Sequence, residues 1–241
     1  NKKTGNPFVT QNNFVITAVN GGKTIFHQLN SPSVGKFTTE YNFDEYDTVN
    51  KISDSDLYDV YFYCTTASET LTATVSNGKI QENGTETTTK TFSSTNQNYI
   101  CHLGKITAGS TVTVTAGDGQ TLSACYAYAF DDAAWQEDYK LLNQNPYVVD
   151  TFTDTKITGK IDATSQGIMY TSIPYDKSWS VYVDGVKTEL TPICNGALIG
   201  VFIDAGSHEV TFKYTPRGFV PGILITLLCL LIFIGLIFKD R

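Results

Sequence analysis

The densest group of side chains that could do chemistry lies in the run Ser172–Trp179. The rings of Tyr175 and Trp179 could stack on the C–H face of a sugar, and the Asp176 carboxylate could accept hydrogen bonds from sugar hydroxyls. The same residue types also have structural uses. Pro174 can end a strand, an Asp can cap a turn, and a Trp can fill the core of a small sandwich. We therefore keep Tyr175, Asp176 and Trp179 as candidate carbohydrate-binding residues beside this architectural interpretation.

The other titratable residues form no catalytic or metal-binding motif. Short acidic clusters could hold a hard cation or take part in acid–base catalysis, but none has the Gly and the distal Glu of an EF-hand loop. The three histidines are far apart in the sequence, and no HExxH, Gly-x-Ser-x-Gly or P-loop motif occurs. We expect no catalytic residue, no metal site and no cofactor in this chain, and solvated acids in turns and caps. The acidic clusters are Asp44–Asp47, Asp54–Asp59, Asp131-Asp132 and Glu137-Asp138.

The cysteines leave the disulfide state open. Cys64, Cys101, Cys125 and Cys194 precede the hydrophobic C-terminal run, and Cys229 lies inside it. Four cysteines permit three pairings. Free, half-buried strand cysteines are the simplest interpretation, because no Cys-x-x-Cys motif supports a redox or metal role.

Composition favours pleated sheet and argues against nucleic acid as a partner. The 241 residues contain 17 Lys and Arg against 24 Asp and Glu, a net charge of −7, without a basic cluster that could follow a phosphate backbone. Aromatic residues reach 12%, Thr supplies 34 residues and Met only one. A chain rich in Thr, Tyr, Phe and Val suits strands better than helices.

Strand-like runs separated by turn sequences predict an antiparallel, jelly-roll-like sandwich within residues 1–145. The runs recur about every ten residues, as in sandwich folds, and Asn77-Gly78 and Gly117-Asp118-Gly119 are turn sequences between them. Residues 1–50 are expected to be irregular. The expected strands are Leu57–Thr66, Thr70–Ser76, Thr85–Phe92, Tyr99–Lys105, Ser110–Ala116 and Thr121–Phe130.

One short helix is expected to follow, at about residues 132–143. Asp131 or Asp132 can cap its N-terminus. Bulky residues at positions i, i+4 and i+7 then fall on one helical face, which we expect to pack on the core. These residues are Trp135, Tyr139 and Leu142.

Residues 146–217 predict a second, smaller antiparallel sandwich. Asp184-Gly185, between Val183 and Val186, indicates a two-residue hairpin, because a type I′ turn needs positive φ at both central residues. The expected strands are Lys156–Ile161, Gly167–Ile173, Trp179–Val183, Val186–Leu190, Ala197–Ile203 and Glu209–Tyr214.

A hydrophobic run without charge predicts a single transmembrane helix within residues 218–241. Fifteen of the twenty residues 219–238 are Leu, Ile, Val or Phe, and twenty helical residues span about 30 Å, the thickness of a bilayer's hydrocarbon core. Lys239 and Arg241 then suggest a short cytoplasmic tail. Residues 1–217 are expected on the other side of the bilayer. Because Asn1 is not Met and the opening residues lack an apolar signal core, we expect a removed signal or a longer membrane protein.

Two runs of the second region resemble the C-terminal signature of the YfhO family of bacterial membrane proteins. These are Ser172–Gly185 (SIPYDKSWSVYVDG), and Asp204–Pro216 (DAGSHEVTFKYTP) followed by the terminal hydrophobic helix. The family's usual Gly before the Trp is Ser178 here. Further upstream, Asn6-Pro7-Phe8, Gln11–Phe14 and Ser31–Phe37 are also similar to the family.

Members of this family look like polytopic GT-C-type glycosyltransferases, which transfer sugars from polyprenyl-phosphate donors to cell-surface polymers such as lipoteichoic acid. The resemblance implies that this chain is the extracytoplasmic C-terminal region and last helix of such an enzyme in a bacterial cell membrane. Its partners would be the bilayer, the missing N-terminal helices of the same protein and a surface polymer. The chain itself would be an accessory, non-catalytic part. The alternative is a membrane-anchored surface carbohydrate-binding or adhesion protein without catalytic activity.

Overall fold

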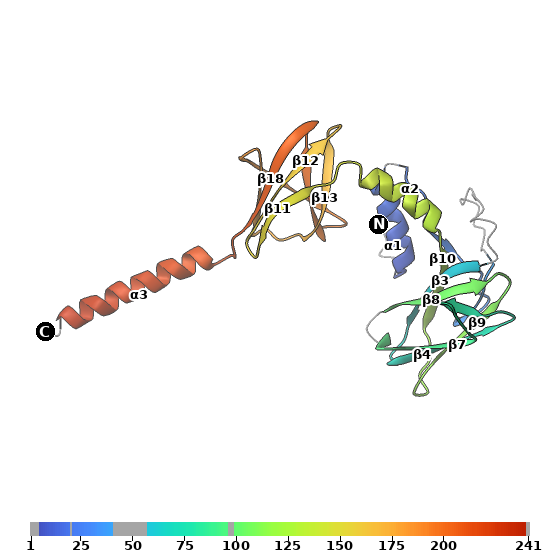
Figure 1. The fold of residues 1–241 in the computed structure, drawn as a ribbon. Helices are drawn as coiled ribbons and strands as arrows, with labels where there is room; N and C mark the ends of the chain where they lie inside the picture. Colours follow the sequence, from blue (N-terminus) through green and yellow to red (C-terminus); the bar gives the residue numbers. More distant parts are fainter. Residues whose placement is uncertain (1–4, 20, 41–56, 96–98, 240–241) are drawn as a thin grey trace. The chain divides into compact units, whose positions relative to one another are not determined.

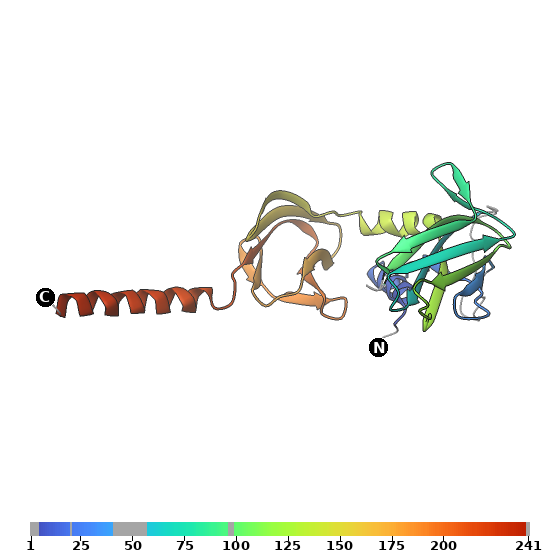
Figure 2. The same ribbon diagram turned by 90° about the horizontal axis from the view of Figure 1, so that it is seen from below.

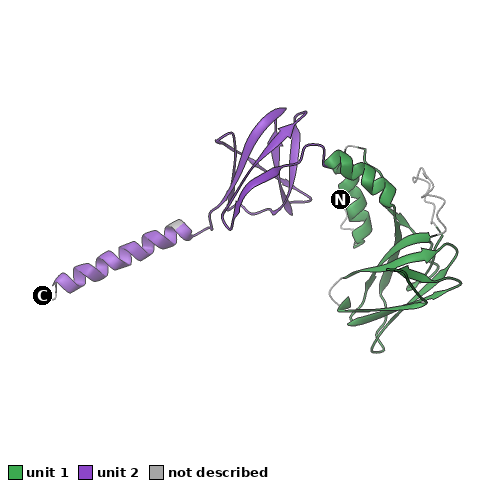
Figure 3. Ribbon diagram, viewed as in Figure 1, with its two compact units in different colours: residues 1–142 green, residues 143–241 purple. Residues whose placement is uncertain are grey.

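A computed structural model describes residues 5–19, 21–40, 57–95 and 99–239 (Figure 1). Strands make up 49% of the residues that the structure describes and the paired strands are antiparallel, so the expectation of a mainly β protein is confirmed. The chain divides into two compact units, Asn1–Leu142 and Asn143–Arg241 (Figure 3).

Unit 1 contains two antiparallel sheets. The strand order is β1-β10-β3-β8-β5-β6 in one sheet and β2-β9-β4-β7 in the other. The strands are β1 (Phe26–Gln28), β2 (Lys36–Thr38), β3 (Leu57–Thr65), β4 (Thr70–Ser76), β5 (Ile80–Glu82), β6 (Thr85–Thr87), β7 (Thr89–Ser93), β8 (Ile100–Thr107), β9 (Thr111–Ala116) and β10 (Ala124–Phe130).

Alternating burial along the strands of unit 1 builds the core between its two sheets. In β3, Val60, Phe62 and Cys64 are buried while the residues between them are only partly covered. Leu71 of β4 and Val112 of β9 contribute the same cluster from the other sheet. Because side chains of a strand alternate between its faces, the period-two pattern in the sequence is enough to place one face of β3 in the core.

The N-terminal segment is helical, which corrects the expectation that residues 1–50 are irregular. Helix α1 (Pro7–Ala18) begins after Asn6, whose side chain accepts a hydrogen bond from the backbone N–H of Phe8. An Asn cap followed by Pro is a favourable helix start. Asn12 of α1 accepts hydrogen bonds from the backbone N–H groups of Ile25 and Phe26 at 3.1 and 2.9 Å. These bonds fasten α1 to β1.

Helix α2 (Asp132–Leu142) lies where the sequence predicts a helix, and Asp131 caps it by accepting a hydrogen bond from the N–H of Ala134. Its buried face differs from the expected one. Ala134 and Asp138 are buried, Trp135 is half-buried, and Tyr139 is 46% exposed. Trp135 packs against the hydrophobic cluster that includes residues of α1 and β1, as expected of a core anchor, and the Asp138 carboxylate accepts a hydrogen bond from the backbone N–H of Lys23.

Unit 2 is a smaller pair of antiparallel sheets that face each other (Figure 2). The strand order is β11-β12-β18-β14-β15 in one sheet and β13-β17-β16 in the other. These strands are predicted from the sequence apart from β11 and β16. The strands are β11 (Val148–Thr153), β12 (Lys156–Ala163), β13 (Gly167–Pro174), β14 (Trp179–Val183), β15 (Val186–Thr188), β16 (Leu190–Ile193), β17 (Leu198–Ile203) and β18 (Gly206–Tyr214).

The β14–β15 hairpin has the predicted turn. Asp184 and Gly185 have φ values of 50° and 80°, and Val183 pairs with Val186. Positive φ at both central residues is the type I′ geometry that matches the twist of the flanking strands. After β18, the chain passes through four residues into helix α3 (Phe219–Lys239).

Candidate functional site

The candidate residues Tyr175, Asp176 and Trp179 lie in and beside the turn that joins β13 to β14. Asp176 Oδ1 accepts a hydrogen bond from the backbone N–H of Ser178 at 2.6 Å, and the backbone carbonyl of Asp176 accepts one from Trp179 at 3.1 Å. Hydrogen bonds from Ser178, and more weakly the charge of Arg217, lower the pKa of the Asp176 carboxyl. The exposed carboxylate therefore stays ionised and holds the turn.

The two candidate rings are half-buried against the core of unit 2. The Trp179 ring meets Phe212 edge-on, with centroids 6.5 Å apart, and its centroid is 5.0 Å from that of Tyr214. Tyr175 packs against the same cluster. Part of each ring is committed to packing, so Asp176 offers the more accessible polar contact of the three.

The turn is linked by strand pairing to β18, the strand that leads into α3. Trp179 pairs with Tyr214 in the β14–β18 ladder, and Tyr214 precedes Phe219 by five residues. Five Cα steps extend to at most about 18 Å. Trp and Tyr are the residues enriched where a protein meets the headgroup region of a bilayer.

Unit 1 carries a second group of half-buried rings, which the sequence analysis missed. The face of β3 opposite the core between the two sheets carries Asp59, Tyr61 and Tyr63, and both Tyr rings pack in part against a second hydrophobic cluster built from α1, β1, β10 and α2. Tyr63 pairs with Tyr126 of β10, and their rings stack with an interplanar angle of 7° and centroids 6.4 Å apart. The signal was available in the alternation of Leu57–Thr65, where the outward positions are as aromatic as the inward ones.

An imidazole–carboxylate pair adjoins these rings. His102 of β8 stacks on Tyr61 with centroids 4.4 Å apart, and its Nε2 lies 2.7 Å from Asp59 Oδ1. Burial, and then the charge of Asp59, raise the pKa of the Tyr61 hydroxyl, which therefore stays neutral at physiological pH. We call Asp59, Tyr61, Tyr63, His102 and Tyr126 the aromatic face. Flat rings with a hydrogen-bonding pair at their side could bind a polyol through its C–H surfaces and its hydroxyls.

Within the residues that the structure describes, no three His, Cys, Asp or Glu side chains gather as a metal site would require. Of the predicted acidic clusters, Asp131 caps α2 as expected, whereas Asp138 on the same helix is buried and not solvated. Residues 44–47 and 54–56 lie outside the described ranges.

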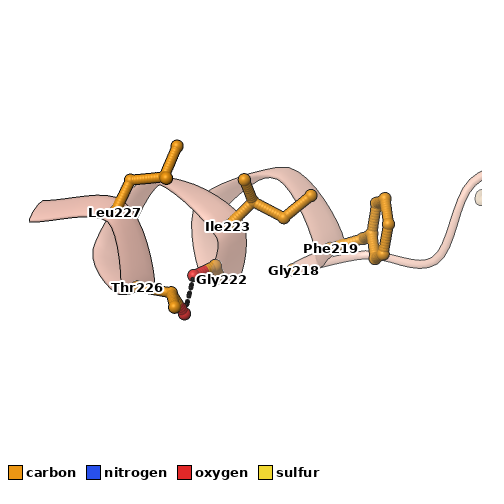
Figure 4. Close-up of a pocket in the computed structure, with 6 residues that line it drawn as sticks. All are labelled: Gly218, Phe219, Gly222, Ile223, Thr226 and Leu227. Atoms are coloured by element: carbon orange, nitrogen blue, oxygen red, sulfur yellow. Dashed lines mark hydrogen bonds between the residues drawn. The ribbon is translucent and has the colours of Figure 1, made fainter. Parts of the chain in front are cut away.

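Helix α3 contains the stretch Pro221–Phe238, which is long and apolar enough to cross a membrane. Its first turns carry a shallow groove along Gly222 and Thr226, bordered by larger apolar side chains (Figure 4). The Thr226 hydroxyl donates a hydrogen bond to the carbonyl of Gly222 at 2.9 Å, so this hydroxyl is satisfied within the helix. A Cβ added at Gly222 would meet nothing within 4 Å. Small residues spaced by four let a second helix approach closely in a membrane.

Comparisons with known proteins identify the family. No protein of curated function matches the sequence. A crystal structure of quercetin 2,3-dioxygenase from Acinetobacter baumannii aligns with a TM-score of 0.17 and 12% identity, over 66% of this chain and 60% of that one. A similarity this low does not bear on fold or activity. The family described as "Bacterial membrane protein YfhO" matches residues 1–226, both β units and the first turns of α3. The chain therefore belongs to the YfhO family of bacterial membrane proteins.

Proposed function

We propose that this chain is the extracytoplasmic accessory region of a polytopic membrane glycosyltransferase. The enzyme would transfer sugars from a polyprenyl-phosphate donor to a cell-surface polymer such as lipoteichoic acid. The observation that carries the proposal is the family match across both β units and into α3. Residues 1–217 would lie outside the cytoplasm and the C-terminus inside. The donor would be bound by the other helices of the same protein, and this chain would supply no catalytic residue.

The accessory role would be to hold the acceptor polymer near the membrane. The aromatic face of unit 1 supports this role, since the Tyr63–Tyr126 stack and the Tyr61–His102 stack present half-buried rings beside the Asp59 carboxylate. Tyr175, Asp176 and Trp179 would form a second contact close to the bilayer. The hydroxyls of a sugar polymer suit Asp59 and Asp176, and its C–H surfaces suit the rings.

The small-residue face of α3 supports packing against further helices of the same protein. A single anchor helix surrounded by lipid makes no close helix–helix contact, whereas the last helix of a bundle packs against its neighbours through small residues. The groove at Gly222 and Thr226 is open enough for such a neighbour.

The size of the native protein tests the proposal most directly. An antibody against residues 1–217, applied to membranes of the source cells, should detect a band far above 26.5 kDa, the mass of this chain. A band near 26.5 kDa would contradict the glycosyltransferase proposal. It would favour a membrane-anchored carbohydrate-binding or adhesion protein instead.

Acceptor binding is tested by retention of purified lipoteichoic acid on the full chain in lipid nanodiscs. The double variant Tyr63→Ala/Tyr126→Ala should lose at least about tenfold in affinity, equivalent to about 1.4 kcal/mol. Asp176→Asn tests the second contact separately. Tyr139→Ala on α2 is the matched control, because this Tyr is exposed and lies outside both groups. Equal retention by all variants would leave a scaffolding role and exclude acceptor binding at these residues.

A further inference from the structure

Two cysteines face each other across neighbouring strands in the core of unit 1. Cys64 of β3 and Cys125 of β10 are register partners, and their Sγ atoms lie 2.6 Å apart. Directly opposed residues in an antiparallel pair have Cα atoms about 4.5–5.5 Å apart, inside the range of about 4.4–6.8 Å that a disulfide bridges. Both are free thiols in this structure.

The register selects one pairing among the possible ones. Cys101 of β8 points into the same core, but its register partner in β3 is Phe62, which places Cys101 diagonal to Cys64. Diagonal residues lie about 7–8 Å apart, beyond the usual Cα separation for a disulfide. Cys194 belongs to unit 2 and Cys229 to helix α3, so neither is placed by the fold of unit 1 beside this pair.

We propose that Cys64 and Cys125 are a disulfide-forming pair that covalently links β3 to β10. The oxidant would be an external disulfide, either a small-molecule disulfide or that of a thiol oxidoreductase. The Cys125 thiolate attacks one sulfur of the external disulfide, forms a mixed disulfide and releases the first thiol. The Cys64 thiolate then attacks Cys125 Sγ, closes the internal disulfide and releases the second thiol. Two cysteine thiols are oxidised, one external disulfide is reduced to two thiols, and the two cysteine protons end on those thiols.

The order of the two steps follows from burial. Cys64 is 2% exposed, whereas Cys125 is partly exposed and can meet an external disulfide first. The hydrogen bond to Cys125 and burial raise the pKa of Cys64, and burial raises the pKa of Cys101 to about 12. Both buried thiols therefore stay protonated, and Cys101 stays unreactive. Cys64 reacts only once a mixed disulfide at Cys125 provides a target beside it.

Differential thiol labelling of the full chain in membranes tests the proposal. Denaturing lysis in N-ethylmaleimide blocks free thiols, reduction then opens disulfides, and a maleimide mass tag counts the released cysteines. After exposure to oxidised glutathione, two of the five cysteines should carry the tag. Digestion without reduction should give one linked peptide pair that contains Cys64 and Cys125, a measurement that needs no variant.

Matched substitutions separate the proposed pair from the other thiols. Cys125→Ser should abolish tagging, and Cys64→Ser should reduce it to at most the one tag of an unresolved mixed disulfide at Cys125, whereas Cys101→Ser and Cys194→Ser should leave two tags. Zero tags in the unaltered chain after oxidised glutathione would overturn the proposal. A linked peptide that contains Cys101 in place of Cys64 or Cys125 would overturn it equally.

Discussion

The carboxylate of Asp138 on α2 accepts a hydrogen bond from the backbone N–H of Lys23 at 2.7 Å, and it does so while 2% exposed. Lys23 lies five residues beyond the end of α1, and its side chain also forms an ion pair with Glu137. Asp138 therefore ties the N-terminal segment of unit 1 to the helix that ends this unit, across 115 residues of sequence. A buried charge is tolerated here because a backbone donor faces it directly.

Replacing Asp138 with Ala should destabilise unit 1 by about 1–3 kcal/mol, because the Lys23 N–H loses its acceptor and a void remains. Asp138→Asn, which keeps an acceptor oxygen, should cost less. Unit 1 contains one Trp, Trp135, so its urea unfolding can be followed by fluorescence in a Trp179→Phe background. Asp132→Asn, at an exposed position of the same helix, is the control. An unfolding midpoint for Asp138→Ala equal to that of the control would contradict this account.

The turn at Asp184-Gly185 predicts a specific cost for a Cβ at Gly185. The φ of Gly185 is 80°, in the left-handed region, and a Cβ added there would meet no neighbour within 4 Å. Any loss of stability on substitution would therefore come from backbone strain alone. Gly185→Ala should destabilise unit 2 by about 1 kcal/mol. The matched control is Gly167→Ala, which is equally open but lacks a positive φ and should be neutral. The urea unfolding of both variants can be followed by Trp179 fluorescence in a Trp135→Phe background. Equal unfolding midpoints for Gly185→Ala and Gly167→Ala would exclude strain at the turn.

Features of the fold that depend on neighbouring residues could be predicted from the sequence. The local sequence was sufficient to predict the Asp184-Gly185 hairpin, the cap of α2 and the alternating strands, because each depends on residues only a few positions apart. The apolar run of α3 was equally clear from its composition.

Most of the features that the sequence does not predict involve partners that are distant in sequence. Helix α1 was missed although Asn6-Pro7 is a helix start, because its apolar residues acquire a clear role only when they pack on β1 and β10. The burial of Asp138 on α2 is not predicted, because its hydrogen-bond partner, the backbone N–H of Lys23, lies 115 residues away in sequence. The aromatic face escaped notice because strand pairing, which no local pattern reveals, brings Tyr63 beside Tyr126. In unit 2 the strands β11 and β16 are not predicted. The side chains of β11 are exposed along its whole length, so no burial pattern marks it, and β16 has only four residues.

His208 and Asp184 predict a pH dependence in unit 2. His208 Nδ1 lies 2.7 Å from Asp184 Oδ2, and this hydrogen bond raises the pKa of His208 and lowers that of Asp184. The contribution of His208 is fully present below pH 6.5, its ordinary value, and is lost as the pH rises through the elevated pKa. The contribution of Asp184 is present above pH 3.8 and is lost as the pH falls through its depressed pKa.

Histidine hydrogen–deuterium exchange followed by mass spectrometry should place the titration of His208 above pH 6.5. Asp184→Asn should return it toward 6.5, because the hydrogen bond and the negative charge are both weakened. His27 and His102 lie in unit 1 and serve as internal controls whose curves the substitution should not move. A His208 curve that does not change in Asp184→Asn would show that the contact has no electrostatic consequence in solution.

The proposed Cys64–Cys125 disulfide predicts a redox-dependent stability for unit 1. The two residues are 61 positions apart, and closing a loop of that size in the unfolded chain stabilises the folded state by about 2–4 kcal/mol. The urea midpoint reported by Trp135 should therefore be higher for the oxidised chain than after reduction. Cys125→Ser should unfold at one midpoint with or without reductant, and a redox shift that persists in this variant would point to another cysteine pair.

The small-residue face of α3 predicts a position-specific loss in the native membrane protein. Gly222→Leu adds a side chain where a neighbouring helix would approach, and such overpacking costs about 1–3 kcal/mol. Gly235→Leu is the matched control. It has the same open surroundings, but at 3.6 residues per turn it lies about 220° around the helix from Gly222. In mild detergent, the midpoint of heat-induced aggregation should fall for Gly222→Leu and stay unchanged for Gly235→Leu. If both variants behave like the unaltered protein, α3 faces lipid at Gly222, and its place as the last helix of a bundle would have to be abandoned.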